Sequence, residues 1–193
     1  MANRGASSST IKPRSTCYHR CMLRQIVLVS GAPGAGKTTL AVPLAAELGF
    51  PLLSKDDFKE TLWDALDLPS GDRTWSRKVG GAAMEVLWTL AARCPSAVLE
   101  APFRPESALE RGRLASLDAQ FVEVHCSCSP AVAIRRYNAR AHERHPTHVL
   151  QVMTAEHLTE FDGPMHVGPV IDVDTEEVVD LPRLARRIQK LLA

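Results

Sequence analysis

Short apolar runs alternate with amphipathic segments along most of the chain. The run QIVLVS at 25–30 is continuous, which is typical of a strand buried on both faces of a parallel sheet. Later segments of the same kind are PLLS at 51–54, SAVLEA at 96–101, QFVEVHC at 120–126 and PVIDVD at 169–174. The pattern therefore predicts five strands.

Segments with helical periodicity separate the predicted strands. We expect helices over 37–48, in two stretches between 57 and 94, over 105–118, and from Pro130, after an N-cap at Ser129, to about 142. Pro43 falls inside the first helix and should bend it or relax one hydrogen bond. Strands that alternate with helices favour a doubly wound α/β domain, whose ligand binds beyond the carboxyl ends of the strands.

Two more helices are expected in the last quarter of the chain. One should begin at Thr147 and carry a single apolar stripe, formed by Leu150, Met153, His157 and Phe161. The other is capped by Asp180 and should turn four residues toward the core, namely Leu181, Leu184, Ile188 and Leu191.

Residues 1–24 have a different character, because they are polar, rich in Ser and Arg, and without a period of 2 or 3.6. They predict a disordered leader before a single domain at 25–193. No stretch approaches the roughly 18 apolar residues of a membrane span, and no early run is long enough for a signal-peptide core. We therefore expect a cytoplasmic protein without membrane association.

Composition and charge narrow the class of partner. Hydrophobic residues make up 45% and charged residues 23%, as in ordinary globular proteins. Lys+Arg at 23 and Asp+Glu at 22 leave a net charge of +1, so long nucleic acids are not expected as partners. The spacing of Cys126 and Cys128 along a predicted strand does not favour zinc binding.

The segment GAPGAGKT at 31–38 carries the most specific chemistry. It fits G-x-x-x-x-G-K-[ST] and lies between a buried strand and a helix, the context that this motif requires. Its glycines allow backbone amides to wrap a phosphate at a helix N-terminus. Nucleotide binding is expected of Gly31, Ala32, Gly34, Ala35, Gly36, Lys37, Thr38 and Thr39. The Lys37 ammonium would neutralise the β and γ phosphates of ATP, and the Thr38 hydroxyl would bind Mg²⁺.

Several classes of nucleotide-binding protein are excluded by missing motifs. A guanine-reading N/T-K-x-D is absent after a late strand, since the nearest approach, SKDD at 54–57, comes far too early. No D-x-x-G switch, ABC signature or hydrophobic run ending in Asp-Glu occurs, and the chain is too short for a full AAA+ module with its helical lid. A small phosphotransferase remains.

Four segments resemble the P-loop kinase families that include gluconate kinase, adenylylsulfate kinase, zeta-toxin-like kinases and chloramphenicol phosphotransferase. They are GAPGAGKTT at 31–39, LLSKDDFKE at 52–60, VLEAPFR at 98–104 and SPAVAIRRYNAR at 129–140. The chain looks most like the predicted kinases of that group, over about residues 25–192. This resemblance implies a P-loop NTPase-type, parallel five-stranded sheet with helices on both faces and a small helical lid.

The resemblance also implies an acceptor site. Asp56 would contact the acceptor hydroxyl, because a carboxylate at a strand's carboxyl end, across from the P-loop, can orient or deprotonate it. The alternative is that Asp56 or Asp57 only caps the next helix. Lys59 would face the same pocket and hold an anionic acceptor, and Glu100 would hold a magnesium-bound water or the acceptor hydroxyl. Arg104 is expected in the substrate-side loop.

In related kinases a mobile lid follows the fourth strand. Arg136 and Arg140, one helical turn apart, would neutralise the triphosphate as the lid closes, and Arg144 extends the set. The alternative is a solvated basic face. A metal site is not favoured for the nearby histidines, His142, His145 and His148. Thr175 follows the last strand, where the resemblance implies a loop over the adenine.

The sequence thus predicts an ATP- and Mg²⁺-dependent kinase that phosphorylates a hydroxyl group of a small molecule. Its acceptor stays open between a sugar, an antibiotic, a nucleoside and a nucleic-acid end. Trp63 and Trp75 either stack on an acceptor ring or pack the substrate-side helices. Two other functions remain, a nucleotide-sensing regulatory module without acceptor chemistry and a polynucleotide 5′-kinase. The oligomeric state is also open.

Overall fold

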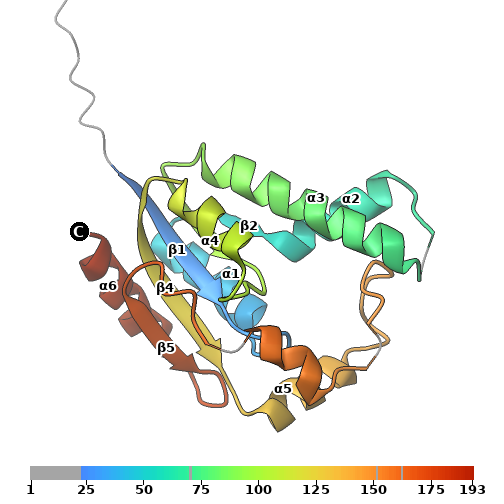
Figure 1. Cartoon of the computed structure of the whole chain (residues 1–193). Coiled ribbons are helices and arrows are strands. Elements are labelled where there is room, and N and C mark those ends of the chain that lie inside the picture. Colours follow the sequence, from blue (N-terminus) through green and yellow to red (C-terminus); the bar gives the residue numbers. More distant parts are fainter. Residues whose placement is uncertain (1–22, 70, 151, 162) are drawn as a thin grey trace, which may run out of the picture.

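The computed structural model of the chain describes residues 23–69, 71–150, 152–161 and 163–193. The predicted leader at 1–24 lies outside this part except for its last two residues, and Arg24 already begins the first strand. In the described residues, strands and helices alternate along the chain as the sequence predicts (Figure 1).

The five strands form one parallel sheet in the order β2-β3-β1-β4-β5. They are β1 (Arg24–Ser30), β2 (Leu52–Ser54), β3 (Ser96–Glu100), β4 (Ala119–Ser127) and β5 (Val170–Asp174). In the register of the sheet, Glu100 lies opposite both Ser54 and Val29. Because all the strands run the same way, their carboxyl ends meet at one edge of the sheet.

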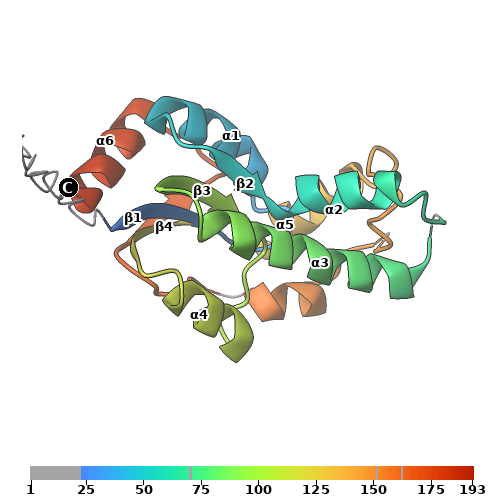
Figure 2. The ribbon, with the colours of Figure 1, turned by 90° about the horizontal axis from the view of Figure 1, so that it is seen from above.

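Helices cover both faces of the sheet, which confirms the predicted fold class. They are α1 (Lys37–Leu48), α2 (Lys55–Ala65), α3 (Arg73–Ala91), α4 (Ala108–Ala115), α5 (Pro130–Ala139), the 3-10 helix η1 (Ala155–Phe161) and α6 (Leu181–Leu192). Figure 2 shows α1 and α6 on one side of the sheet and α3 and α4 on the other.

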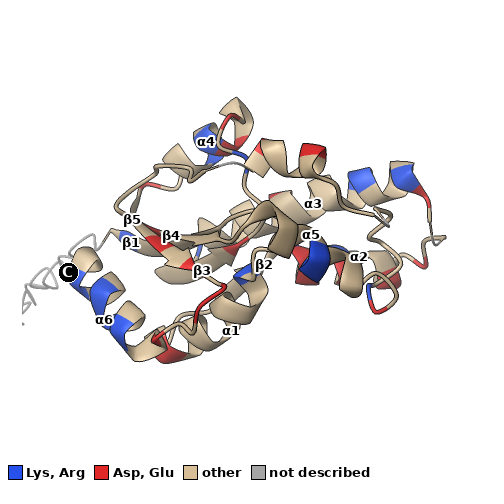
Figure 3. Ribbon diagram, turned by 90° about the horizontal axis from the view of Figure 1, so that it is seen from below, with Lys and Arg blue, Asp and Glu red and all other residues tan. Residues whose placement is uncertain are grey.

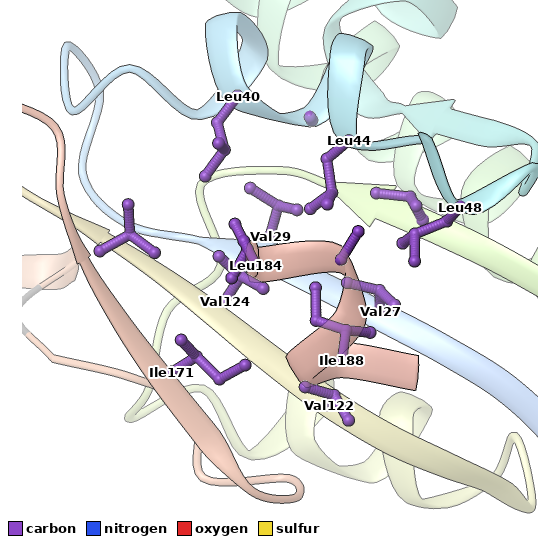
Figure 4. Close-up of a cluster of buried hydrophobic side chains, with 14 of the residues drawn as sticks. Val27, Val29, Leu40, Leu44, Leu48, Val122, Val124, Ile171, Leu184 and Ile188 are labelled. Carbon is purple, nitrogen blue, oxygen red and sulfur yellow. The ribbon is translucent and has the colours of Figure 1, made fainter. Parts of the chain in front are cut away.

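Alternate residues of each strand supply the two halves of the core. Val27 and Val29 point to the side of α1 and α6, where they pack with Leu40, Leu44 and Ile188 (Figure 4). Ile26 and Leu28 of β1 point the other way. They pack against α3 and α4, with Leu87, Leu99, Phe103 and Leu114.

Two of the three tryptophans in α2 and α3, Trp63 and Trp75, were candidates for acceptor binding, and their environments differ. Trp63 is buried in α2, whereas Trp75 is partly exposed in α3, with the Lys78 ammonium 4.8 Å from its ring centroid. Neither lines the large cavity described below. Trp63 therefore serves packing, which was one of the two predicted roles.

The helix predicted from Thr147 does not form there, and only the 3-10 helix at Ala155–Phe161 appears. Side chains of α5 instead form hydrogen bonds with backbone groups of this segment that would otherwise pair within a helix. The Asn138 carboxamide accepts from the Met153 amide at 2.8 Å and donates to the Met153 carbonyl at 3.3 Å. Tyr137 donates to the Leu150 carbonyl at 3.3 Å.

Smaller corrections concern helix ends and one core residue. The helix predicted over 105–118 covers only Ala108–Ala115, and the helix expected to reach about 142 ends at Ala139. Leu191 was expected to face the core but is 38% exposed, and Leu192 is buried in its place. The buried stripe of α6 follows the four-residue spacing of 184, 188 and 192, which leaves 191 at its edge.

Within the described residues, no helix combines the length and the apolar character needed to cross a bilayer.

Candidate active site

The loop between β1 and α1 approaches its neighbours so closely that two of its glycines have no room for a side chain. A Cβ atom at Gly31 would collide with the carbonyl oxygen of Cys126, and one at Gly34 with that of Ala133 in α5. Both glycines also have positive φ, at 128° and 86°. The sequence of the loop therefore serves its packing as well as its expected phosphate contacts.

A buried carboxylate supports the base of this loop. Glu123 in β4 accepts hydrogen bonds from the Ser30 hydroxyl at 2.6 Å and from the backbone amides of Met165 and His166 at 2.8 and 2.9 Å. Ser30 is the last residue of β1, directly before the loop. The sequence alone does not reveal this contact, because nothing in its pattern brings residues 165–166 next to β4.

Lys37 begins α1 and is only 7% exposed. Its ammonium donates to the Ala32 carbonyl at 2.9 Å, so the side chain lies across the mouth of the loop. Burial lowers the pKa of Lys37, and the nearby carboxylates of Glu100 and Asp56 oppose that shift. This is the position from which a P-loop lysine reaches phosphate oxygens.

Glu100 ends β3, is 3% exposed, and joins the loop to the second strand. Its carboxylate accepts from the Ser54 hydroxyl at 3.0 Å and lies 3.4 Å from the Thr38 hydroxyl. Burial raises the pKa of Glu100, although the charge of Lys37 counteracts this. The Thr38 and Glu100 oxygens are hard donors of the kind that Mg²⁺ takes in small number, together with water and phosphate. The residues present therefore fit a magnesium ion.

Asp56 lies in the first turn of α2, across from the loop. Ser54 caps this helix, since its hydroxyl accepts from the Asp57 amide at 3.4 Å, so neither Asp56 nor Asp57 provides the N-cap. The Asp56 carboxylate is 44% exposed and pairs with Lys55 at 2.7 Å. Burial alone would raise the pKa of Asp56, but Lys55 and His148 outweigh it and hold the pKa below its ordinary value.

One cavity of about 780 Å³ joins these groups. Eight of the predicted site residues line it: Gly34, Gly36, Lys37, Thr38, Thr39, Asp56, Glu100 and Arg140. Ala32 and Ala35 instead line a second cavity of about 250 Å³, which is bordered also by Cys126 and Cys128. The large cavity thus spans the P-loop, the carboxyl edge of the sheet and α2.

Lys59 and Arg104 do not line that cavity, contrary to expectation. Lys59 of α2 is buried against α3, and its ammonium donates to the Ser76 hydroxyl at 2.9 Å and the Thr147 carbonyl at 3.1 Å. Burial lowers the pKa of Lys59 to about 8. Arg104 turns to Glu110, with an ion pair at 2.6 Å. Both cations have partners from α3, α4 or the segment after α5, which sequence spacing does not reveal.

The two predicted lid arginines also separate. Arg136 donates to the Thr175 hydroxyl at 3.0 Å and to its carbonyl at 2.8 Å, and the Thr175 hydroxyl donates to the Ala35 carbonyl at 2.9 Å. These contacts fix the loop after β5 against the P-loop. Arg140 is the C-cap of α5, where the helix ends, and it alone of the two lines the large cavity.

Residues 144–150, which we call the strap, follow α5 and lead toward α2. Arg144 lies 3.2 Å over the Tyr137 ring and donates to the Tyr137 and Leu150 carbonyls. Two histidines then bind the exposed side of α2, with His145 2.9 Å from Asp64 and His148 2.8 Å from Glu60. Burial lowers the pKa of His148. In the sequence, only the concentration of His and Arg at 140–148 hinted at these contacts.

The cavity wall also includes residues of β2, α2, α5, the strap and the position before it that were not predicted as site residues. They include Ser54, Lys55, Asp57, Glu60, Tyr137, Glu143, His145 and His148. Among the described residues, no three His, Cys, Asp or Glu side chains are arranged to hold a metal ion by themselves.

Comparisons with known proteins agree with this fold. A family model described as an AAA domain matches residues 26–159, and the remaining β5 and α6 complete the same sheet and its cover. A Chloroflexus aurantiacus protein, whose structure is described as that of a "putative kinase", is 31% identical; the match covers 89% of this chain and 100% of that one, with a TM-score of 0.79. A search of curated protein sequences found no match.

Two more distant structures share the fold. The APS kinase of Mycobacterium tuberculosis, in complex with AMPPNP and APS, is 20% identical, with a TM-score of 0.58 over 88% of this chain and 98% of that one. The shikimate kinase of Acinetobacter baumannii, in complex with shikimate, is 20% identical, with a TM-score of 0.53 over 88% and 93%. The chain therefore belongs to the AAA domain family matched over residues 26–159, and it has the fold of P-loop small-molecule kinases.

Proposed function

We propose that this protein is a kinase that transfers the γ-phosphate of ATP to a hydroxyl group of a small-molecule acceptor. The observation that carries the proposal is the single cavity with Lys37 and Thr38 at one end and the Asp56 carboxylate at the other. A phosphate donor and a hydroxyl acceptor could both occupy a space of about 780 Å³.

The nucleotide end offers positive charge and backbone amides. The loop amides would bind the phosphates at the N-terminus of α1, and the Lys37 ammonium would neutralise charge on the β and γ phosphates. Thr38 and Glu100 would hold Mg²⁺, directly or through water, and the bound ion would supply further charge neutralisation. The exposed Arg140 guanidinium would contact the phosphoryl group in transfer.

At the acceptor end, Asp56 would orient the attacking hydroxyl. Its lowered pKa keeps the carboxylate ionised at neutral pH, so it can accept the hydroxyl hydrogen bond and then the proton. A phosphoryl-transfer transition state is loose, so orientation matters more than strong basicity. The acceptor oxygen bonds to the γ-phosphorus while the bond to the β-phosphate oxygen breaks, leaving ADP.

The test is acceptor-stimulated formation of ADP from ATP and Mg²⁺ over a panel of sugars, aminocyclitols, nucleosides and hydroxylated antibiotics. We expect Asp56→Asn to lower transfer by about 10²–10⁴-fold with ATP affinity changed only a few fold. Lys37→Ala should weaken ATP binding and abolish transfer. Asp172→Asn, an exposed position on β5, is the control and should behave as wild type.

Two results would contradict the proposal. ATP binding without stimulation by any acceptor would indicate a nucleotide-sensing module instead. Normal turnover in both Asp56→Asn and Asp57→Asn would remove the acceptor carboxylate from the mechanism. If Asp57→Asn alone were inactive, the role of Asp56 would belong to its neighbour.

A further inference from the structure

The wall of the cavity opposite the P-loop is acidic. The first two turns of α2 direct Asp56, Asp57 and Glu60 to it, and the α2 cation that also lines it, Lys55, pairs with Asp56 at 2.7 Å. Figure 3 colours the acidic positions of α2, like all Asp and Glu, red and the basic positions blue. This end of the cavity therefore carries more carboxylates than free cations.

The cations that could have bound an anionic acceptor are already engaged by other groups. Lys59 is buried against Ser76 and the Thr147 carbonyl, and Arg104 pairs with Glu110. Arg144 of the strap does line the cavity, but its guanidinium is stacked on Tyr137 and donates to the Tyr137 and Leu150 carbonyls. A carboxylate, sulfate or phosphate group on the acceptor would thus face acidic side chains without a cation available beside them.

Asp57 has no ion-pair partner within 4.0 Å among the described residues. Partial burial and then the charge of Glu60 raise the pKa of Asp57, so a cation beside the two carboxylates would relieve an unfavourable arrangement. Glu60 already accepts one contact from His148 at 2.8 Å, and it keeps a second carboxylate oxygen. Asp57 and Glu60 are three residues apart on one helix and can contact the same group.

The rest of the wall favours a polar acceptor. Tyr137 is the one aromatic side chain among the lining residues, and most of the others are charged or hydroxyl-bearing. Resting on the proposed kinase function, we propose that the acceptor is a polyhydroxylated amine, such as an amino sugar or aminocyclitol. Asp57 and Glu60 bind its ammonium group, while Asp56 orients the hydroxyl that is phosphorylated.

The first experiment compares acceptors that share a carbon skeleton and differ in charge. Wild-type protein with ATP and Mg²⁺ is given glucosamine, glucose, N-acetylglucosamine and gluconate, and a parallel set built on aminocyclitols, and ADP formation is measured. We expect kcat/KM to be at least about tenfold higher for an amine than for its N-acetyl derivative, and the acid to be inactive.

The second experiment tests the two carboxylates with the best amine of that panel. Asp57→Asn and Glu60→Gln should each raise the KM for the amine by about tenfold, leave the KM for ATP within a few fold, and remove the preference over the N-acetyl derivative. Glu85→Gln is the matched control, because Glu85 is exposed on α3 and pairs with Arg113 away from the cavity.

The outcomes separate this inference from the proposed function. Fastest turnover of acids, or equal turnover of an amine and its N-acetyl derivative, would overturn the inference while the kinase function stood. Turnover of none of these acceptors, while a nucleoside or hydroxylated antibiotic of the wider panel is phosphorylated, would overturn the inference alone, and turnover of no acceptor in either panel, with ATP bound normally, would overturn both. The acceptor comparison uses wild-type protein, so a poorly folded variant cannot obscure it.

Discussion

Burial of Glu100 beneath Ser54 and Thr38 has opposite consequences for the stability of the fold and for the proposed reaction. Burial raises the pKa of its carboxyl group, so the folded protein holds this proton more tightly than the unfolded chain does. The proposed reaction uses the ionised form, because only a carboxylate attracts a magnesium ion strongly. Groups whose pKa is displaced in this way are common at reactive sites.

We predict that Glu100→Gln stabilises the protein without nucleotide and lowers its activity. A raised folded pKa favours folding below the ordinary value of 4.5, and that advantage is lost as pH rises through the folded pKa. Gln mimics the protonated side chain, so the thermal transition at pH 7 should rise, by about 2–4 °C for each kcal/mol gained. The difference from wild type should vanish near pH 4. A lower transition at pH 7 with normal turnover would contradict this.

At the scale of elements, the P-loop is wedged between the sheet and α5. Gly34 has φ 86° and meets Ala133 of α5, whereas Gly49 at the end of α1 has φ 67° and nothing within 4 Å of an added Cβ. Alanine substitution at both glycines imposes backbone strain, whereas only at Gly34 does the added Cβ also collide with a neighbour. Comparing the two variants therefore separates the cost of strain from the cost of collision.

We predict that Gly49→Ala costs about 1–2 kcal/mol of unfolding free energy, the usual penalty for a left-handed alanine, and keeps ATP affinity. Gly34→Ala should cost more and reduce ATP binding at least about tenfold, because the loop or α5 must shift. Urea unfolding and nucleotide titration measure both. Equal effects of the two variants would show that α5 does not constrain the loop.

The strap is joined to α2 and α3 through Lys59, whose pKa is lowered to about 8. A lowered folded pKa contributes stability that is present above the ordinary value of 10.5 and is lost as pH falls through about 8. We predict that wild type gains unfolding free energy relative to Lys59→Met between pH 7 and pH 9.5, measured by urea unfolding. Lys190→Met, at an exposed position of α6, should show no such pH dependence. A difference that does not change with pH would contradict the prediction.

At the scale of the whole molecule, the core packed on both faces of the sheet around β1 supports a site at the carboxyl edge of that sheet. Ile188 of α6 is fully buried, whereas Leu191, three residues later, is 38% exposed. Neither lines the large cavity.

We predict that Ile188→Ala lowers unfolding free energy by about 2–5 kcal/mol, the usual cost of truncating a buried aliphatic side chain. Leu191→Ala should change it by only a few tenths of a kcal/mol. At temperatures where both variants are folded, turnover should stay at the wild-type level. A large loss of stability in Leu191→Ala would mean that this residue is buried in solution.

The sequence could predict most of the sheet, because continuous apolar runs reveal buried strands whatever their partners. It could also place Asp56 and Glu100 near the P-loop, since the carboxyl ends of parallel strands meet. It could not predict Lys59, Arg104 or the strap, because their positions depend on partners distant in the chain, such as Thr147 for Lys59. Leu191 was wrongly predicted to face the core. Residues spaced four apart shift gradually around a helix surface, so the buried face continues from 188 to 192 and not to 191.

The acidic wall of the cavity has a consequence for how such proteins diverge. The contribution of α2 and its cap comes from five residues within the short stretch 54–60, whereas the nucleotide end draws on the P-loop, β3 and α5. Changes in that one short stretch of the gene would alter which molecule is phosphorylated and leave the handling of ATP intact. Exchange of this segment between relatives would be a direct route to a new substrate range.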